Sequence, residues 1–302
     1  MGVGNKIRAK VAYGNSNLIA YLFILPFVIL YTTFIVLPMI GIVIKSFTNN
    51  NVAALEIFSP HMFRTVEFTL ENYVRLFSHP WSLRVLSSTL SVATAALVLS
   101  FVIGTPAAYA ITRPTFKSSR IVSWFLSLPI YLPTVVTAFA LVWFFGSMGV
   151  VNTILKGLFG FTVPLAYTFI AVVLGTVCII TPVYIRTVAT AFEKIQPEVF
   201  EASMSLGANE IYTFWRIALP MVKQMIFAGL IFKYSMTIGM MEMAMVVGGG
   251  GVRVQHIAVE IFQSALGFNL NITFASAMAT FLLVIALIGQ ALSLAYLWRS
   301  ER

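Results

Sequence analysis

Residues 193–220 read EKIQPEVFEASMSLGANEIYTFWRIALP, and their chemistry predicts a short helix, a sharp turn and a second helix. Pro197 suits a first helical turn, where a missing N–H costs nothing, and Gly207 is placed to end that helix in a left-handed conformation. Asn209 can cap the second helix. Apolar residues on this second helix recur at i, i+3, i+4 and i+7 and are expected to share one face: Ile211, Phe214, Trp215 and Ala218.

The first helix of this stretch carries small side chains at Ala202 and Ser203, and the small Gly207 follows it. Small residues let the backbone of another protein approach closely, which favours a docking surface. Amphipathic helices at a membrane surface also often do no more than cap a helix bundle. The periodicity alone leaves both interpretations open.

Outside this stretch the chain is too apolar for a water-soluble protein. Of its 302 residues, 59% are apolar and 10% are charged, whereas soluble domains average roughly 45–50% and about 25%. A membrane-spanning helix needs about 20 mostly apolar residues. Six stretches meet this requirement: 18–44, 88–111, 121–145, 165–185, 221–247 and 273–298. The expected fold class is therefore all-α, a polytopic membrane protein with six transmembrane helices.

The six spans divide the chain into segments with distinct expected locations. The first apolar run is too long for a cleaved signal sequence, so it is interpreted as a retained first span. The outer segment is expected to form one or two short amphipathic helices. The divisions are a cytoplasmic N-terminus (1–17), the first transmembrane helix (18–44), an outer segment (45–87), a core of five transmembrane helices (88–298) and a cytoplasmic C-terminus (299–302).

The distribution of basic residues predicts the orientation of these spans. Lys and Arg accumulate on the cytoplasmic side of membranes, and most of those in this chain fall in four segments: 1–17, 112–120, 186–220 and 299–302. Both termini and the 193–220 loop are therefore expected in the cytoplasm. The net charge of +9 is explained as a topology signal, and no nucleic-acid partner is expected.

The central stretch resembles a known protein family. Glu201-Ala202-Ser203, then three residues, Gly207, nine residues, Ile217, one residue and Leu219-Pro220 is similar to the EAA loop of binding-protein-dependent ABC importer permeases. Ser203 stands where alanine is usual in that pattern. The resemblance runs from about residue 70 to the C-terminus and includes the segments 105–110, 128–133 and 214–216.

Membership of this family implies a type I ABC importer permease-like fold in the cytoplasmic (inner) membrane, surrounded by lipid. The implied partners are two ATP-binding cassette ATPase subunits, a second permease subunit, identical or homologous, and an external solute-binding protein. The permease core then spans 88–298, with 193–220 as its cytoplasmic coupling loop. The residues implied to couple it to the ATPases are Glu201, Ala202, Ser203, Gly207, Ile217, Leu219 and Pro220.

The chain carries no motif for catalysis or cofactor binding. A phosphate-binding loop requires a Gly-Lys pair followed by Ser or Thr, and no such pair occurs. Cys178 is the single cysteine, and His61, His79 and His256 are isolated in outer segments, which is typical of surface histidines. We therefore expect no enzyme activity, no metal site and no cofactor, with ATP bound and hydrolysed by a partner subunit.

Charged residues and prolines within the spans are candidates for the translocation path. A charge at the bilayer centre costs roughly 2.5–3.5 kcal/mol, so Lys233 is expected to face a cavity or a partner. Glu242 lies near the outer end of its span, where reaching the interface is an equally good explanation. Pro129 and Pro133 free backbone carbonyls that need partners, and the hydroxyl of Thr134, like that of Thr137, could supply one.

Two other functions remain as alternatives. A self-contained ion-coupled carrier or channel would need no ATPase, and a membrane-embedded enzyme would need a catalytic constellation that the sequence lacks. The segment 68–73, FTLENY, and the chain length look most like permeases of the polyamine, aminoethylphosphonate, sulfate, iron and thiamine importer group. This resemblance implies a small polar or charged solute as the substrate. Selectivity in such systems rests largely on the external binding protein.

Overall fold

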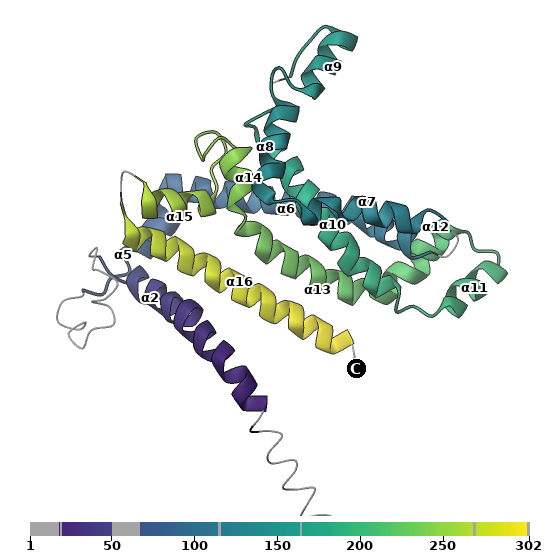
Figure 1. Cartoon of the computed structure of the whole chain (residues 1–302), viewed down its shortest axis with the longest axis horizontal. Coiled ribbons are helices and arrows are strands. Elements are labelled where there is room, and N and C mark those ends of the chain that lie inside the picture. Colours follow the sequence, from purple (N-terminus) through teal and green to yellow (C-terminus); the bar gives the residue numbers. More distant parts are fainter. Residues whose placement is uncertain are drawn as a thin grey trace, which may run out of the picture. The chain divides into compact units, whose positions relative to one another are not determined.

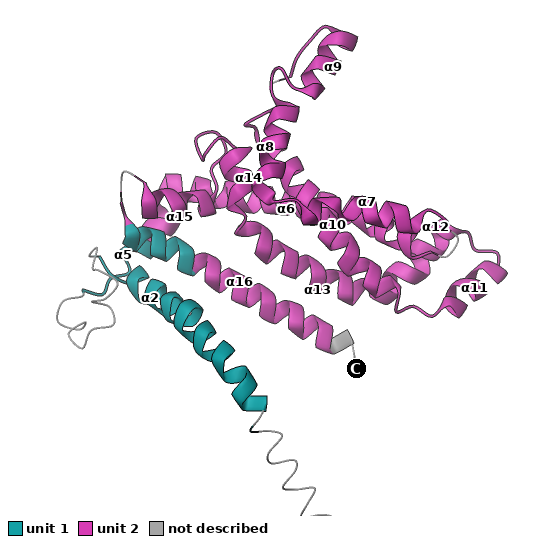
Figure 2. Cartoon of the chain, in the orientation of Figure 1, with its two compact units in different colours: residues 1–73, 272–280 teal, residues 74–271, 281–302 magenta. Residues whose placement is uncertain are grey.

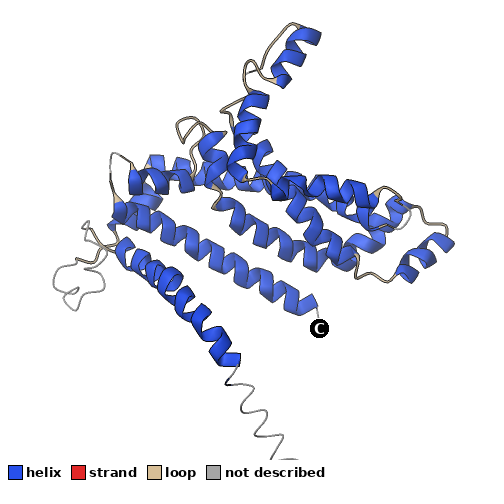
Figure 3. Ribbon diagram, viewed as in Figure 1, coloured by secondary structure: helices blue, strands red, loops and turns tan. Residues whose placement is uncertain are grey.

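The structure is a computed structural model that describes six segments of the chain: residues 18, 20–49, 67–113, 116–163, 165–267 and 270–300. These residues are mostly helical (Figures 1 and 3). Among them, six helices are long and apolar enough to cross a membrane: Ala20–Ser46, Pro80–Thr112, Thr134–Phe159, Phe169–Phe192, Glu210–Ile238 and Ile272–Trp298. The predicted all-α class with six transmembrane helices is confirmed. The predicted N-terminal segment 1–17, part of the outer segment (50–66) and the last two residues (301–302) lie outside the described residues.

Residues 1–73 and 272–280 form the first of two compact units (Figure 2). Its described elements include η1, a π-helical turn (Thr32–Val36), α2 (Leu37–Ser46) and the start of α5 (Glu71–Ser78). The side-chain amide of Asn72 donates to the carbonyls of Ser46 (3.1 Å) and Thr48 (2.9 Å). These bonds fasten the end of the first span to the segment that follows it.

Residues 74–271 and 281–302 form the second unit. Helix α10 lies at its centre and packs against both α6 and α13. The helical elements that reach into this unit are α5, α6 (Pro80–Thr112), α7 (Ser119–Tyr131), α8 (Thr134–Phe145), α9 (Val150–Phe159), α10 (Phe169–Phe192), α11 (Pro197–Ser205), α12 (Glu210–Thr213), η2 (Phe214–Ala218), α13 (Leu219–Ile238), α14 (Met241–Val246), α15 (Ile257–Leu266) and α16 (Ile272–Ser300).

Buried hydroxyl pairs join α6 to α10. Ser100 Oγ lies 2.8 Å from Thr181 Oγ1, and Thr105 Oγ1 lies 2.8 Å from the hydroxyl of Tyr184. Gly104 makes the second contact possible, because a Cβ at this position would lie only 2.7 Å from the ring of Tyr184. Small residues and interhelical hydroxyl contacts of this kind hold helices together where lipid removes the hydrophobic driving force.

Helix α16 approaches α13 in the same manner. Ser293 Oγ donates to the carbonyl of Ala228 (2.9 Å). One turn earlier, a Cβ on Gly289 would collide with Ser235 Oγ. Gly289 and Ser293 therefore form a small-xxx-small face on which the two helices meet.

The predicted third span, 121–145, is not one helix. Helix α7 ends at Tyr131, and Leu132 and Pro133 are extended before α8 begins at Thr134. The residue before a proline is disfavoured in the helical region, which explains the break at Leu132. The candidate span runs instead from Thr134 to Phe159, through α8 and the α9 helix that lies in the predicted outer loop 146–164.

The second and fifth spans also differ from the predicted bounds. Helix α6 begins at Pro80, not at residue 88, because His79 Nδ1 caps it by accepting from the Trp81 N–H (3.3 Å). Helix α13 ends at Ile238, and α14 follows after a break at Gly239. The predicted single span 221–247 is therefore two helices, and the predicted outer loop 248–272 contains α15.

Candidate coupling site

The 193–220 loop folds as its sequence predicts. Helix α11 begins with Pro197 in its first turn, and Gly207 ends it with φ +84°. The Gly207 N–H donates to the carbonyl of Met204 (2.9 Å). Asn209 Oδ1 accepts from the Tyr212 N–H (2.8 Å) and caps α12. The helix, left-handed turn and capped second helix are confirmed.

The single apolar face expected on the second helix is wrong. Phe214 and Ala218 are buried, but Ile211 is 72% exposed and Trp215 is 58% exposed. The cause is Pro220, whose ring clashes with the carbonyl of the preceding turn and whose nitrogen has no hydrogen to donate. The backbone before Pro220 therefore forms the π-helical turn η2, in which the Leu219 N–H donates to the carbonyl of Phe214. Such a turn holds an extra residue and rotates the side chains that precede it.

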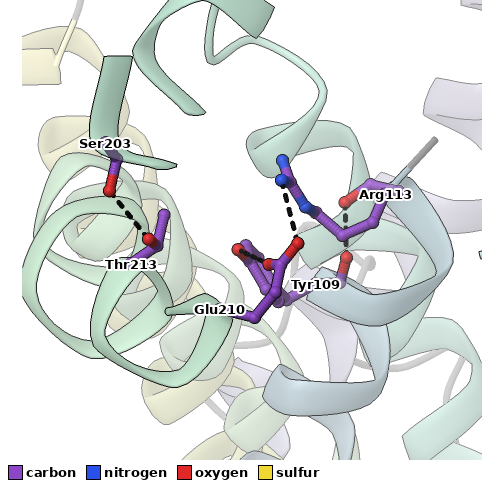
Figure 4. Close-up of polar contacts among 6 residues, drawn as sticks. Tyr109, Arg113, Ser203, Glu210 and Thr213 are labelled. Carbon is purple, nitrogen blue, oxygen red and sulfur yellow. Dashed lines mark hydrogen bonds and ion pairs between the residues drawn. The ribbon is translucent and has the colours of Figure 1, made fainter. Parts of the chain in front are cut away.

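Ser203 is buried instead of being presented to a partner. Its side chain is 4% exposed, and its hydroxyl oxygen lies 2.8 Å from Thr213 Oγ1, which is fully buried (Figure 4). Ala202 and Gly207 are exposed. The hydroxyl pair joins α11 to the second helix, so Ser203 holds the two helices of the loop together.

Exposed apolar side chains gather on the same loop. We call this set the docking patch; its members are Met204, Leu206 (88% exposed), Ile211, Tyr212 and Trp215. A hollow of about 540 Å³ lies beside it, lined in part by Gly207, Asn209, Arg216 and Ile217. Several large apolar side chains exposed on one short loop are typical of a protein or membrane interaction site.

The loop is also attached to the C-terminal end of α6. Glu210 Oε1 lies 3.3 Å from Arg113 Nη2, and Glu210 Oε2 accepts from the Tyr109 hydroxyl (2.9 Å) (Figure 4). The Arg113 guanidinium lies 3.9 Å from the centre of the Phe200 ring on α11. Sequence reasoning missed these contacts. The available signal was the spacing of Tyr109 and Arg113, which at i, i+4 lie on one face of the helix.

The candidate path residues Lys233 and Glu242 are not brought together. Lys233 is buried within α13, with Nζ 5.4 Å from the centre of the Phe232 ring. Glu242 is half-buried in the first turn of α14, beyond the break at Gly239. Within the described segments no ion pair joins these two side chains.

The prolines of α7 and α8 occupy different positions. Pro129 lies inside α7, whereas Pro133 is the N-cap residue of α8 and is exposed. The hydroxyl of Thr137 donates to the carbonyl of Pro133 (3.4 Å), which supplies the kind of partner expected for this segment. Thr134 is half-buried at the start of α8.

One histidine expected at the surface is buried. His256 is 3% exposed, and its Nδ1 caps α15 by accepting from the Ala258 N–H (3.3 Å). Burial lowers the pKa of His256 to about 4, so the ring is neutral at physiological pH. In the part of the chain that the structure describes, no group of three or more His, Cys, Asp or Glu side chains is placed to hold a metal ion.

Residues 100–298 match the protein family described as "Binding-protein-dependent transport system inner membrane component". The chain is 28% identical over 225 residues to the spermidine/putrescine transport system permease protein PotB of Haemophilus influenzae, covering 74% of this chain and 77% of that protein. It is 27% identical over 176 residues to the sulfate transport system permease protein CysT of Synechocystis, covering 58% and 60%.

Solved structures of low sequence identity share the fold. A chain of the bacterial alginate ABC transporter in complex with an alginate pentasaccharide-bound periplasmic protein superposes with a TM-score of 0.76 at 19% identity, covering 92% of this chain and 93% of that one. A chain of the MetNI methionine ABC transporter gives a TM-score of 0.51 at 20% identity, covering 71% and 95%.

Proposed function

Because the chain belongs to the family of binding-protein-dependent transport system inner membrane components, we propose that its 193–220 loop is the segment through which partner ATPases drive transport. The chain is a multi-pass membrane protein and the permease subunit of an ABC importer, and it is not itself an ATPase. Two ATPase subunits bind the ATP, a second permease subunit completes the path, and an external binding protein delivers the solute.

The docking patch is the observation that carries this proposal. Leu206 and Ile211 expose most of their surface at the turn and the second helix, and the patch lies on a loop whose turn contains the left-handed Gly207 and whose second helix is capped by Asn209. Exposed apolar groups on a rigid loop bury area on binding without a large loss of conformational entropy. In this proposal Glu201, Ala202 and Gly207 lie at the contact, and Ser203, Ile217, Leu219 and Pro220 shape it.

The proposed orientation and the proposed contact are tested together by cysteine placement. Cys178→Ser removes the single cysteine, after which Leu206→Cys reports on the loop. Val252→Cys is the matched control, because Val252 is 85% exposed between α14 and α15, outside the candidate spans. We expect an impermeant maleimide to label Val252→Cys from outside intact cells, and Leu206→Cys only after permeabilisation.

The same two variants test ATPase docking. A bifunctional crosslinker is expected to join Leu206→Cys, and not Val252→Cys, to a protein with a nucleotide-binding motif. Labelling of Leu206→Cys from outside the cell would contradict the proposal, as would crosslinking that never captures an ATPase. A chain that moves solute in vesicles without any ATPase would establish the carrier alternative.

Lys233 and Glu242 are proposed to line the solute path. Pro129, Pro133 and Thr134 are proposed to contribute to the same path. A buried ammonium group within a span is costly unless it faces a cavity or a partner, and Lys233 is 7% exposed. A Lys233→Met variant should keep ATP hydrolysis and lose uptake. Normal uptake by this variant, at a normal ratio of solute to ATP, would remove Lys233 from the path.

We propose a small charged solute as the substrate. This rests on the names of the relatives, one of which is a spermidine/putrescine permease and another a sulfate permease. Titration calorimetry of the partner binding protein with spermidine, putrescine and sulfate separates the two charge classes. Tight binding of a neutral sugar, with none of these three bound, would refute a charged substrate.

A further inference from the structure

Glu210 joins the 193–220 loop to a helix that is not continuous with it. The loop is covalently continuous with α10 and α13, whereas α6 lies about one hundred residues earlier and crosses the bilayer from Pro80 to Thr112. Any displacement of the loop must reach α6 through noncovalent contacts. The polar contacts that the structure shows there all pass through the Glu210 carboxylate, one oxygen to Arg113 and the other to Tyr109.

Arg113 contacts both helices of the loop at once. Its guanidinium lies over the Phe200 ring of α11 at 3.9 Å and pairs with Glu210 of α12 at 3.3 Å. The side chain is 8% exposed, and its Nε has no hydrogen-bond partner among the described residues. A planar guanidinium can stack and form a directed ion pair together, which a lysine cannot do. Arg113 therefore fixes the angle between α11 and α12 relative to the end of α6.

Tyr109 adds an apolar contact at the same place. We call the contacts of Tyr109, Arg113 and Glu210 at the end of α6 the joint. Its ring lies 5.4 Å from Phe192 at the end of α10 and 5.0 Å from Phe214 in η2, while its hydroxyl reaches Glu210. A cavity of about 420 Å³ borders the joint between α6, α10 and α11. The ring of Phe200 on α11 lies 6.2 Å from that of Tyr109, so aromatic packing and the directional polar contacts act together to hold α11 at the end of α6.

The joint is poorly suited to a purely stabilising role. The Glu210 side chain is 44% exposed, and ion pairs open to water contribute little to stability. The buried Arg113 Nε without a partner is itself unfavourable. The arrangement fixes geometry at the end of a membrane-crossing helix.

We propose that Tyr109, Arg113 and Glu210 are positioning residues that make the coupling loop and α6 move as one body when the ATPases close. This inference rests on the proposed docking function of the loop. Without the joint, part of the nucleotide-driven movement of the loop would be absorbed at the cavity side of α11, and α6 would follow only through its packing against α10.

Spin-label distances within the chain test this inference in the complex of the permease with its copurified ATPase. In the Cys178→Ser background, spin labels are placed at Gln196 on the loop and at Leu83 near the outer end of α6; both residues are exposed and neither belongs to the docking patch. Distances are measured without nucleotide and after trapping with ATP and orthovanadate. We expect one unchanged distance distribution in the parent protein, and a shifted or broadened distribution after trapping in Glu210→Gln and Tyr109→Phe.

Tyr109→Phe removes one oxygen and keeps the packed ring, so its effect cannot be attributed to misfolding. Glu198→Gln is the matched control, since it removes a carboxylate from α11 at an exposed position. Tyr109→Phe combined with Glu210→Gln should shift the distribution no further than Glu210→Gln alone, because both act on one contact.

The outcomes separate the inference from the proposed function. Variants that keep the parent's distance in both states overturn the inference, and so does an equal effect of Glu198→Gln. In both cases the ATPase is still bound, and docking stands. A parent protein that brings no ATPase through purification refutes the proposed docking, and the inference fails with it.

Discussion

The buried hydroxyl pair beneath the docking patch gives the sharpest test of how the loop is held. Ser203→Ala removes one partner of a 2.8 Å contact and leaves Thr213 Oγ1 fully buried without it. An unsatisfied buried polar group costs about 1–3 kcal/mol. Replacing both partners with apolar groups of similar shape can be nearly neutral, so Ser203→Ala with Thr213→Val should recover most of the loss.

The expected size of the effect follows from the location of the pair. The contact joins α11 to the second helix. Its loss should therefore lower the free energy of local opening of the loop and leave the stability of the transmembrane core unchanged. A cost of about 1–3 kcal/mol corresponds to about 5- to 140-fold more frequent opening. Amides at the turn between the two helices, such as that of Ala208, which donates to the Ser203 carbonyl, and that of Tyr212, which donates to Asn209 Oδ1, should exchange faster by this factor.

Hydrogen–deuterium exchange of the reconstituted protein, read peptide by peptide, measures this opening. Ser203→Ala and Thr213→Val should each accelerate exchange in the 193–220 loop and leave α10 unchanged. The double variant should exchange close to the parent rate. Two single effects that simply add in the double variant would refute the pairing, because coupling between contacting residues is what a double-mutant cycle isolates.

Four further predictions concern other parts of the chain. Gly207→Ala places a Cβ at φ +84°, which costs about 1–2 kcal/mol. Crosslinking of the loop to the ATPase should therefore fall about 5- to 30-fold. Gly207→Asn should reduce crosslinking less, because Asn tolerates the left-handed region better than Ala. Gly289→Ala should lower the melting temperature in detergent, and adding Ser235→Ala should restore it, because the colliding atom is the Ser235 oxygen. Burial lowers the pKa of His256 to about 4 from an ordinary 6.5, so the folded state disfavours protonation of the ring. The capped end of α15 is therefore fully stable above pH 6.5 and should lose about 3 kcal/mol of stability as the pH falls towards 4. Exchange of α15 amides should show this dependence, and His256→Asn should abolish it. Lys233→Met should separate ATP hydrolysis from uptake, which is checked by measuring both in the same vesicles.

Sequence reasoning predicted the loop in detail because its determinants are local. Pro197, Gly207 and Asn209 each act within a few residues of themselves, through a missing N–H, a left-handed backbone and a capping oxygen. The number of spans was equally accessible, because hydrocarbon thickness fixes how many apolar residues a span needs. Both kinds of information are present in a window of about 20 residues.

The errors have physical causes that act beyond such a window or change its period. The third and fifth spans were drawn as continuous because apolar composition persists across the breaks at Leu132 and Gly239. A helical period of 3.6 predicts one apolar face on the second helix, but the π turn before Pro220 breaks this period and leaves Trp215 exposed. The small size of Ser203 predicts an exposed position, whereas its burial depends on a partner ten residues away, Thr213.

The contacts of Glu210 were inaccessible for a different reason. The carboxylate meets Arg113 across nearly one hundred residues, and a single sequence carries no record of which distant helix ends meet. Helix α11 has nine residues, and a helix this short is marginal alone in water, whereas Glu210 begins a continuous helical span that ends at Ile238. The order of α11 must come from tertiary contacts, which include the hydroxyl pair of Ser203 with Thr213 and the stacking of Arg113 on Phe200. In the proposed coupling role, a loop held in this way would resist bending at its own turn, so that force applied by an ATPase at Leu206 would pass to the helices that hold the loop. Rigidity of the loop and its attachment to α6 are therefore one physical requirement, and weakening either should uncouple hydrolysis from movement in the same way.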